Sequence, residues 1–452
     1  MRLPEFWKTG AAILVLGGLG AYIFFVERKR EDREDKPKEK ILAVEKAKAK
    51  EIHLAPAGGE AIRVVKEGEG WRLAAPMSAP ADTSAVDSML TSLEGLEADE
   101  VVVEKAPRLA EYGLEPPKRT VSVTVEGKPE PLAVLFGEKT PDGGGVYAKI
   151  PSSPRVYVVA AWTEGSFDKK PFDLRDRDLL KVKRDDARTL AVTGPEGSYA
   201  LARSEGGEWA FTEPLATRAG RWSLDAVLGT LESLRMESVV AEEAKDLRVF
   251  GLDRPTRTLH LVLKDGTART LEIGGPAGGK DGKKHYAREK GSSLVAVIPG
   301  TLVTDLAKGM GELRAKRLLE VATYETDSFE VAAGGAKKTF AKSTAKDKDG
   351  FDKTQWKRTA PDAKDLETSA VEDALFKLGG VEVQEFVDKP KEPSAYGLDA
   401  PALRIAIKAK GESWAELGRK DGAVYARRSN DQAVLKLDPA KAEELIKAFE
   451  GL

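Results

Sequence analysis

One pattern of residues occurs three times along the chain, and this repetition constrains the fold more than any other feature. Each copy opens with a tryptophan followed five residues later by a proline, and a turn of the form aromatic-Gly-Leu-acidic-x-Pro comes next. The residues of these motifs are Trp71, Pro76, Tyr112, Gly113, Leu114 and Pro117; Trp209, Pro214, Phe250, Gly251, Leu252 and Pro255; and Trp356, Pro361, Tyr396, Gly397, Leu398 and Pro401. Ordered matches at nearly equal spacing do not arise by chance, so the chain is a triplication.

The later part of each copy repeats as well. A strand-like run that ends in glycine is followed by a Tyr-Ala-Lys or Tyr-Ala-Arg segment. The glycines are Gly137, Gly274 and Gly418. The tyrosines and their neighbouring cations are Tyr147 with Lys149, Tyr286 with Arg288, and Tyr425 with Arg427.

Copies of this length are domains rather than the short units of a solenoid. We place the three repeat domains at residues 41–180, 181–319 and 320–452. The third domain is shortened at its carboxyl end, where it lacks the closing segment that the other two share. It also carries a hydrophilic insert near 341–354, for which we predict a solvated loop rather than a calcium site, because the glutamate and the spacing of a calcium loop are missing.

The hydrophobic pattern predicts an α+β fold in which each domain is a twisted antiparallel sheet with one main packed helix. Short alternating apolar runs such as 62–64, 121–125, 156–158 and 259–263 are typical of strands. One apolar helical face recurs in each copy, formed by Val86, Met89, Leu90 and Leu93; by Leu224, Val227, Leu228 and Leu231; and by Val371, Ala374, Leu375 and Leu378. We expect capping pairs at Ser84 with Asp87 and at Ser369 with Glu372. A second helix is expected near the end of each domain, for example over 439–449.

The repeated motifs have structural interpretations and two functional alternatives. The tryptophan and proline of Trp-x4-Pro could form a flat apolar platform for binding, but a structural role is more common. A tryptophan at a strand end fills the core, and the following proline stops the strand. The turn needs glycine for a positive φ and proline to fix its exit. Tyr147 with Lys149, Tyr286 with Arg288, and Tyr425 with Arg427 place a cation beside an aromatic ring on a strand. This row is either solvated strand charge or a surface for a partner.

The amino terminus predicts a membrane anchor. After a short tail at residues 1–8, residues 9–26 carry no charge and span roughly 27 Å as a helix, which matches one hydrocarbon core. The competing interpretation is a cleavable signal peptide, but no small-x-small cleavage pattern follows the run. Residues 27–40 form a charged stalk, in which 13 of 14 residues are charged. The seven cations there favour a cytoplasmic side, whereas long domains cross membranes largely regardless of charge, so the orientation stays open.

Composition argues against catalysis. The chain has no cysteine and three histidines, His53, His260 and His285, none of which recurs at the matching position of another copy. Residues 274–280 fit G-x-x-x-x-G-K, but Asp281 follows where a phosphate loop needs serine or threonine. The net charge of −2 provides no basic field for nucleic acid. We therefore expect no enzyme activity, no catalytic or metal-binding residue, no cofactor and no binding of nucleotides or nucleic acid.

Taken in order, the anchor, the Trp-x4-Pro pair, the aromatic-Gly-Leu turn, the strand ending in glycine and the Tyr-Ala-cation segment resemble the bacterial domain of unknown function 4340 family (DUF4340). The resemblance covers about residues 42–452. It implies a single-pass protein of the bacterial inner membrane with periplasmic carboxyl-terminal domains. It also implies an accessory role beside gliding-motility-type ABC transporter components, with a permease or auxiliary subunit as partner, and it carries over no catalytic residue.

The expected function is therefore that of a membrane-anchored extracytoplasmic accessory or binding protein of an ABC-type export or envelope system. It would contact the bilayer through residues 9–26. Two alternatives remain: a spacer that binds envelope polysaccharide or peptidoglycan, and an envelope hydrolase with an acidic site between domains. The spacer predicts exposed aromatic residues aligned on one face of all three domains.

Overall fold

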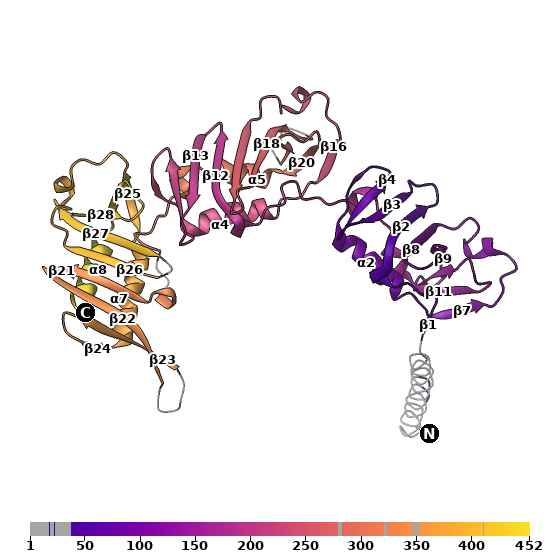
Figure 1. The fold of residues 1–452 in the computed structure, drawn as a ribbon, viewed down its shortest axis with the longest axis horizontal. Coiled ribbons are helices and arrows are strands. Elements are labelled where there is room, and N and C mark those ends of the chain that lie inside the picture. Colours follow the sequence, from indigo (N-terminus) through magenta and orange to yellow (C-terminus); the bar gives the residue numbers. More distant parts are fainter. Residues whose placement is uncertain are drawn as a thin grey trace, which may run out of the picture. The chain divides into compact units, whose positions relative to one another are not determined.

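The computed structural model describes residues 18, 22, 38–278, 283–320, 323–346, 352–409 and 411–452, in two compact units, Met1–Arg177 and Asp178–Leu452. The first unit contains one nine-stranded antiparallel sheet and the second contains two, which confirms the predicted α+β class (Figure 1). Apart from residues 18, 22 and 38–40, the predicted tail, anchor and stalk lie outside the described residues. Within the described ranges, no helix has the length and apolar composition needed to cross a bilayer.

The first unit contains the first repeat domain. Its sheet order is β5 (Ala79–Pro80), β4 (Gly70–Ala75), β3 (Ile62–Glu67), β2 (Ala49–Pro56), β8 (Arg119–Val125), β9 (Leu132–Lys139), β10 (Gly145–Lys149), β11 (Val156–Ala160) and β7 (Glu100–Val103). The helices are η1 (Lys46–Lys48), α2 (Thr83–Glu94), η2 (Leu109–Tyr112), α3 (Ala161–Gly165) and η3 (Pro171–Leu174). Strand β1 (Glu39–Lys40) pairs with β6 (Glu97–Ala98), so the last two residues of the predicted stalk belong to this domain.

The second unit begins with the second repeat domain. Its sheet order is β15 (Thr217–Arg218), β14 (Trp209–Glu213), β13 (Gly197–Arg203), β12 (Ala187–Gly194), β17 (Arg257–Leu263), β18 (Ala268–Pro276), β19 (Lys284–Glu289), β20 (Val295–Pro299) and β16 (Ser238–Ala241). The helices are η4 (Arg184–Asp186), α4 (Arg221–Glu232), η5 (Arg248–Phe250), α5 (Gly300–Ala307) and α6 (Met310–Leu313).

The third repeat domain completes the second unit. Its sheet order is β24 (Lys364–Leu366), β23 (Asp352–Ala360), β22 (Ala336–Lys346), β21 (Ser328–Ala333), β26 (Leu403–Lys408), β27 (Glu412–Lys420), β28 (Ala423–Arg428), β29 (Val434–Leu437) and β25 (Val383–Val387). The helices are η6 (Thr323–Glu325), α7 (Thr368–Gly380), η7 (Pro393–Tyr396) and α8 (Pro439–Glu450).

The insert of the third domain differs from the loop that we predicted. Strands β22 and β23 extend into it and pair as far as Lys346 with Asp352, so most of its described residues belong to a hairpin. The pairing satisfies backbone groups through the antiparallel ladder, which needs no apolar side chain. A hydrophilic segment can therefore be a strand where a neighbouring strand continues alongside it.

All three sheets have the same order of strands, and this order explains the main helix. In each nine-stranded sheet the first four strands along the chain run outward from the middle to one edge, and the next strand of that sheet lies at the opposite edge. Helices α2, α4 and α7 make that crossing over one face of the sheet (Figure 1). Their apolar faces are the predicted ones, since every residue that we assigned to the three helical stripes is buried.

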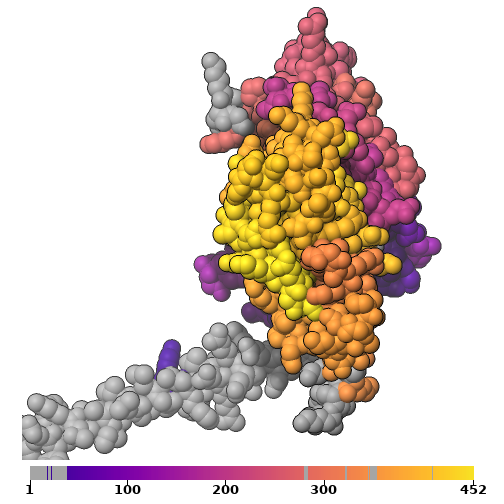
Figure 2. All heavy atoms as spheres, turned by 90° about the vertical axis from the view of Figure 1, so that its left-hand side faces the viewer, coloured from indigo at the N-terminus to yellow at the C-terminus, as the bar shows by residue number. Residues whose placement is uncertain are grey.

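The ends of the helices only partly match the sequence prediction. Helix α2 is capped by Asp82, whose side chain accepts from the backbone N–H groups of Ser84 and Ala85, and α7 begins after Glu367 without a side-chain cap. The predicted pairs at Ser84 and Ser369 are therefore wrong, because those residues lie inside the helices. The predicted second helix of the third domain is α8, which Asp438 caps. Its buried face joins the core of that domain, and its residues are the yellow end of the chain in Figure 2.

Candidate functional site

The two repeated motifs meet in each domain, although more than twenty residues of chain separate them. The aromatic residue of the turn contacts the tyrosine of the Tyr-Ala-cation segment edge to face. Ring centroids are 5.1 Å apart for Tyr112 and Tyr147, 5.2 Å for Phe250 and Tyr286, and 5.1 Å for Tyr396 and Tyr425. Such pairs stabilise a fold by about 0.5–1.5 kcal/mol beyond the area they bury. The repeated aromatic residues thus contact each other within one domain.

The glycines of the two motifs allow the turn and the strand to come this close. The turn glycines Gly113, Gly251 and Gly397 have φ values of +64°, +67° and +68°, as the sequence predicts. The strand glycine of each copy lies directly against the turn: a Cβ atom at Gly137 or Gly274 would lie 2.1 Å from the carbonyl oxygen of Tyr112 or Phe250. No side chain fits there, so both glycines are needed to dock the turn on the sheet.

The remaining motif residues also serve the fold. Trp71, Trp209 and Trp356 are 5%, 8% and 1% exposed, so they belong to the cores of their domains. The leucines of the turns, Leu114, Leu252 and Leu398, are buried as well. The peptide bonds before Pro76, Pro214 and Pro361 are all cis. The turns exit at Pro117, Pro255 and Pro401, next to the strand that crosses the middle of each sheet.

The cations of the predicted row are held inside their own domains. Arg288 Nε lies 2.8 Å from Glu272 Oε2, and Arg427 Nη2 lies 2.7 Å from Glu416 Oε2, each across one strand pair. The side chains of Arg288 and Glu272 are only 16% and 11% exposed. Solvated strand charge is therefore a poor description of this pair, because the strand lies within the sheet and its neighbour supplies a carboxylate.

In the first domain the cation at the same position has different hydrogen-bond partners. Leu135 stands opposite Lys149, where the other two sheets have a glutamate opposite the cation. Lys149 donates to the carbonyl oxygens of Ile150 and Ser153 instead. Burial lowers the pKa of Lys149, as expected where no carboxylate balances the charge. A surface for a partner at these residues stays a prediction, and its face in the first domain would differ chemically from the faces in the other two.

Sequence reasoning missed a buried ionic joint between the second and third domains. Arg428 is 1% exposed and donates from Nε and Nη2 to Asp431 Oδ2 at 2.9 and 2.7 Å. The side chain of Asp431 is fully buried. Arg428 Nη2 also donates to the carbonyl oxygen of Ala315, at the end of the second domain, at 3.0 Å. Burial lowers the pKa of Arg428, and the carboxylate of Asp431 opposes that shift.

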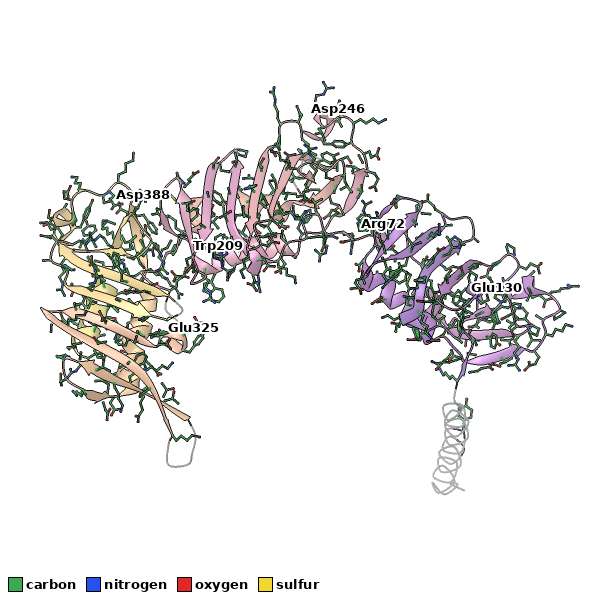
Figure 3. All side chains as sticks on the ribbon, in the orientation of Figure 1. Arg72, Glu130, Trp209, Asp246, Glu325 and Asp388 are labelled. Atoms are coloured by element: carbon green, nitrogen blue, oxygen red, sulfur yellow. The ribbon has the colours of Figure 1, made fainter. Side chains whose placement is uncertain are left out.

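Two more buried arginines from the second domain complete this joint. The guanidinium of Arg314 lies 3.9 Å from the ring centroid of Phe386, and its Nη1 pairs with Asp388 at 2.8 Å. Asp388 lies on the third domain beside the second (Figure 3). Arg218 donates to Ser413 and Ser429 across the joint at 3.3 and 3.4 Å. A backbone bond of 2.8 Å from Gln432 to Ala216 adds to these contacts.

The sequence does indicate the joint, but only when the residues at equivalent positions of the three copies are compared. The strand registers match Arg428 with Glu289 and Ile150, and Asp431 with Ser292 and Ser153. A basic and an acidic residue three apart thus occur at these positions only in the third copy. Divergence of charged residues at otherwise equivalent positions indicates a contact that one domain makes and its sisters do not.

Other residues singled out from the sequence do not come together. His53 lies on β2, His260 on β17 and His285 on β19, and His260 Nδ1 lies 2.9 Å from Thr270 Oγ1. The described part of the chain contains no cluster of three histidine, aspartate or glutamate residues that could hold a metal ion. Residues 279 and 280 of the glycine-rich segment lie outside the described residues, as does Asp281, and residues 274–276 belong to strand β18.

The fold therefore defines a tandem-repeat α+β protein with a fixed joint between two of its three domains. The model of the family described as domain of unknown function (DUF4340) matches residues 71–217 and 209–401. These matches cover more than half of the chain, so the chain belongs to this family, as the resemblance predicted. Each match starts at the tryptophan of one sheet and runs into the next domain. No curated protein and no solved structure matches the chain.

Proposed function

We propose that the protein is a membrane-anchored, extracytoplasmic accessory protein of an ABC-type export or envelope system that binds a partner and performs no chemistry of its own. In this proposal the apolar run 9–26 crosses the inner membrane once, and residues 27–38 form a stalk in the periplasm, up to the strand that begins the first domain. The three domains then face a transporter permease or an auxiliary subunit.

One observation carries the binding role: buried ion pairs fix the second and third domains to each other, whereas the motif residues build the domains themselves. A charged pair at an interface confers geometry more than affinity, and Arg314 of the second domain, which pairs with Asp388 and Asp431 of the third, fits this use. Two domains held at a fixed angle present their outer surfaces together. Contacts that are individually weak then add up through effective concentration.

The spacer alternative is less well supported. Its polymer-binding surface calls for aromatic residues aligned in all three domains. Within the described domains, the exposed large aromatic side chains are Trp162, Trp222, Tyr324 and Phe376. Trp222 matches Ser84 and Ser369 in the other main helices, so its ring does not recur. These rings therefore offer no repeated face to a repetitive polymer.

The hydrolase alternative calls for a carboxyl group with a raised pKa. The pKa values of Glu51 and Glu443 are instead lowered by hydrogen bonds from arginine side chains. Such carboxylates stay ionised at neutral pH and cannot act as general acids there. The lowered pKa values favour structural ion pairs at Glu51 and Glu443.

The test is co-purification of full-length protein, tagged at its carboxyl end, from membranes solubilised in mild detergent. We expect mass spectrometry to identify an ABC permease or ATPase in the eluate. A truncated control that keeps residues 1–40 and the tag should lose this partner, because the domains make the contact. Recovery of the full-length protein alone would rule out a stable assembly and shift the assignment to an envelope binder.

A further inference from the structure

A pocket of about 290 Å³ opens on the second domain beside its joint with the third. Its lining includes three alanines of the second domain, Ala202, Ala210 and Ala216, each of which is partly exposed, and Asn430 of the third domain. Trp209, which is labelled in Figure 3, lines the pocket as well. Since an alanine side chain is a methyl group that forms no hydrogen bond, the three alanines give the pocket an apolar floor.

The strand registers show why this space is open in the second domain. Ala210 stands at the position of Arg72 in the first domain and of Lys357 in the third. Both of these residues are long cations that hold a carboxylate. Arg72 Nε lies 2.7 Å from Glu67 Oε2, and Lys357 Nζ lies 3.3 Å from Asp365 Oδ1. The methyl group of Ala210 therefore leaves open a space that a long side chain covers in the other two copies.

The residues that Arg72 contacts are replaced in the second domain as well. Besides its pair with Glu67, Arg72 has Ser78 Oγ at 3.5 Å from its Nη1. The same two positions of the second domain hold Ser204 and Ala216, and both of these residues line the pocket. The second domain has thus lost the cation, its carboxylate and its second contact together, and small side chains border the space that results.

The charges around the pocket leave one cation without a carboxylate. Arg218 pairs with Glu208 at 2.6 Å, so these two lining charges balance each other. Arg203, the other lining cation, donates from Nε and Nη1 to the carbonyl oxygens of Gly207 and Asp185, at 3.2 and 3.0 Å. Its Nη2 has no hydrogen-bond partner among the described residues and is not buried. The pocket therefore suits a group that combines apolar surface with a negative charge.

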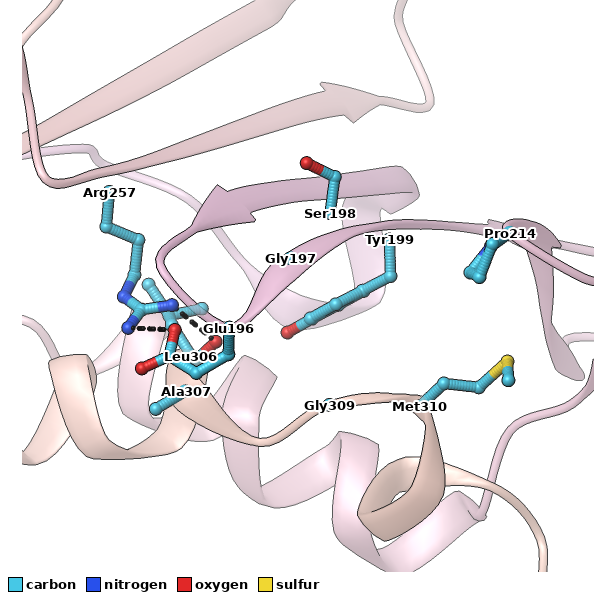
Figure 4. Close-up of a pocket in the computed structure, with 10 residues that line it drawn as sticks. All are labelled: Glu196, Gly197, Ser198, Tyr199, Pro214, Arg257, Leu306, Ala307, Gly309 and Met310. Carbon is cyan, nitrogen blue, oxygen red and sulfur yellow. Dashed lines mark hydrogen bonds and ion pairs between the residues drawn. The ribbon is translucent and has the colours of Figure 1, made fainter.

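A smaller pocket of the same domain provides the contrast. Its arginine, Arg257, pairs with Glu196 at 2.7 Å and donates to the carbonyl oxygen of Leu306 at 3.0 Å (Figure 4). The charge of Arg257 is thus balanced within the domain, whereas the charge of Arg203 is not.

Asn430 adds an amide to the pocket at a position that suits glycine better. Its φ is +57°, in the left-handed region, and the matching Gly291 of the second domain has a φ of +88°. Asparagine adopts this conformation more readily than most residues, but only glycine does so freely. The amide can both donate and accept, as a peptide group requires of its partner. Asn430 is next to Asp431, which pairs with Arg428, so the joint positions this wall of the pocket.

We propose that this pocket binds an apolar side chain of a partner protein, of about the size of leucine, that has an acidic residue next to it. The apolar side chain lies over the three alanines, the acidic side chain pairs with Arg203, and Asn430 binds the peptide group between them. The inference rests on the proposed function, because it names the chemistry through which the partner is bound. It does not depend on that partner being a transporter subunit.

Ligand-observed NMR on the full-length protein in mild detergent tests the site, with protein-free micelles as the blank. The probe is the acetylated and amidated peptide Asp-Leu-Asp, and the matched peptides Asn-Leu-Asn and Asp-Ala-Asp lack its charge or its large apolar side chain. We expect Asp-Leu-Asp to bind, Asn-Leu-Asn to bind about threefold more weakly, and Asp-Ala-Asp to bind about tenfold more weakly or worse. No binding of Asp-Leu-Asp, or equal binding of Asp-Leu-Asp and either control, would overturn the proposal.

Two variants locate the binding. Ala210→Leu fills the pocket with an apolar side chain of the domain itself, so it should abolish peptide binding without lowering the thermal unfolding temperature. Arg203→Gln should bind Asp-Leu-Asp and Asn-Leu-Asn equally, whereas Arg203→Lys should keep the preference for the acidic peptide. A loss of stability cannot imitate this result, since the two peptides are compared on one protein. Should Ala210→Leu fail to fold, Arg203→Gln still decides, and an unchanged preference there would place the peptide elsewhere.

Two further results separate this site from the proposed function. Self-association of the parent protein that Ala210→Leu abolishes would assign the pocket to a second copy of this chain and overturn the proposal. Recovery of a transporter subunit from membranes by Ala210→Leu as well as by the parent would refute the pocket as the contact and leave the accessory role intact. Peptide binding without recovery of any transporter subunit would support the pocket and refute a stable transporter assembly.

Discussion

The repeated motif cluster and the joint between the second and third domains use opposite kinds of residue. The cluster consists of glycines, aromatic rings and backbone carbonyls, and it is built in the same way three times. The joint consists mainly of buried charges, and the pair that the third domain contributes to it, Arg428 with Asp431, occurs in one copy only. Residues shared by the copies specify the domain, whereas residues that differ specify what each domain contacts.

The largest effect should come from breaking the joint. Asp431→Ala leaves Arg428 buried without its carboxylate, and loss of one partner of a buried pair costs about 3–5 kcal/mol. We expect the free energy of unfolding of the second unit to fall by this amount in urea titrations. Hydrogen exchange should speed up at residues 315–318 and 428–433, and the first unit should not change.

Gln432→Ala is the matched control for this prediction. Its side chain is exposed, and its contact across the joint is made by the backbone N–H group. The substitution should change stability by less than about 0.5 kcal/mol. A loss below about 1 kcal/mol in Asp431→Ala would instead mean that water reaches Arg428 and that the joint does not hold the two domains rigidly.

A smaller effect is expected from damage to the shared cluster. Gly274→Ala places a Cβ atom 2.1 Å from the carbonyl oxygen of Phe250, and the backbone must move to relieve the clash. Overpacking of this kind costs about 1–3 kcal/mol. Thermal unfolding and the near-ultraviolet signal of the Phe250–Tyr286 pair should report the loss.

Gly229→Ala, in the same domain, is expected to change the stability in the opposite direction. Gly229 lies within α4, its added Cβ atom would meet nothing within 4 Å, and alanine is favoured over glycine in a helix by about 0.5–1 kcal/mol. We expect a gain in stability. If both glycine variants destabilise equally, the close approach at Gly274 does not explain why glycine is needed there.

Much of each domain could be predicted from the sequence, because it depends on local patterns. The stripe of Leu224, Val227, Leu228 and Leu231 is buried as predicted, and Gly251 has the positive φ that its turn requires. Local patterns were less reliable at helix ends: Asp82 caps α2 where we expected Ser84, since a side chain just outside the helix reaches the free N–H groups first.

Contacts between distant segments could not be predicted. The approach of Gly274 to Phe250, the register that sets Glu272 beside Arg288, and the pairing of Asp388 with Arg314 all depend on tertiary structure. Hydrophobic periodicity carries no information about any of them. Arg119 and Arg257 stand at the same register, yet Arg119 pairs with Glu164 and Asp168 whereas Arg257 pairs with Glu196, and the sequence alone shows none of these pairs.

The smallest expected effect on stability is a pH dependence that comes from an arginine present in two copies and absent from the third. Arg119 and Arg257 have Leu403 as their counterpart in the third domain. Hydrogen bonds from these arginines lower the pKa values of Asp168 and Glu196 below their ordinary values. A carboxyl group with a lowered pKa stabilises the fold at pH values above its unfolded pKa, and this stabilisation is lost as pH falls through the folded pKa. Stability should therefore begin to decrease below about pH 5.

Glu196→Gln measures how much of this loss of stability at low pH comes from the second domain. Because the Glu196 side chain is 47% exposed, we expect a decrease of less than about 1 kcal/mol at pH 7, and this difference from the parent protein should shrink as the pH is lowered. Asp168→Asn gives the corresponding value for the first domain, where Glu164 still pairs with Arg119. The effect of Asp168→Asn should be the smaller one, since its arginine keeps a carboxylate. Equal pH slopes in the parent protein and in Glu196→Gln would show that the ion pair of Arg257 does not distinguish the second domain from the third.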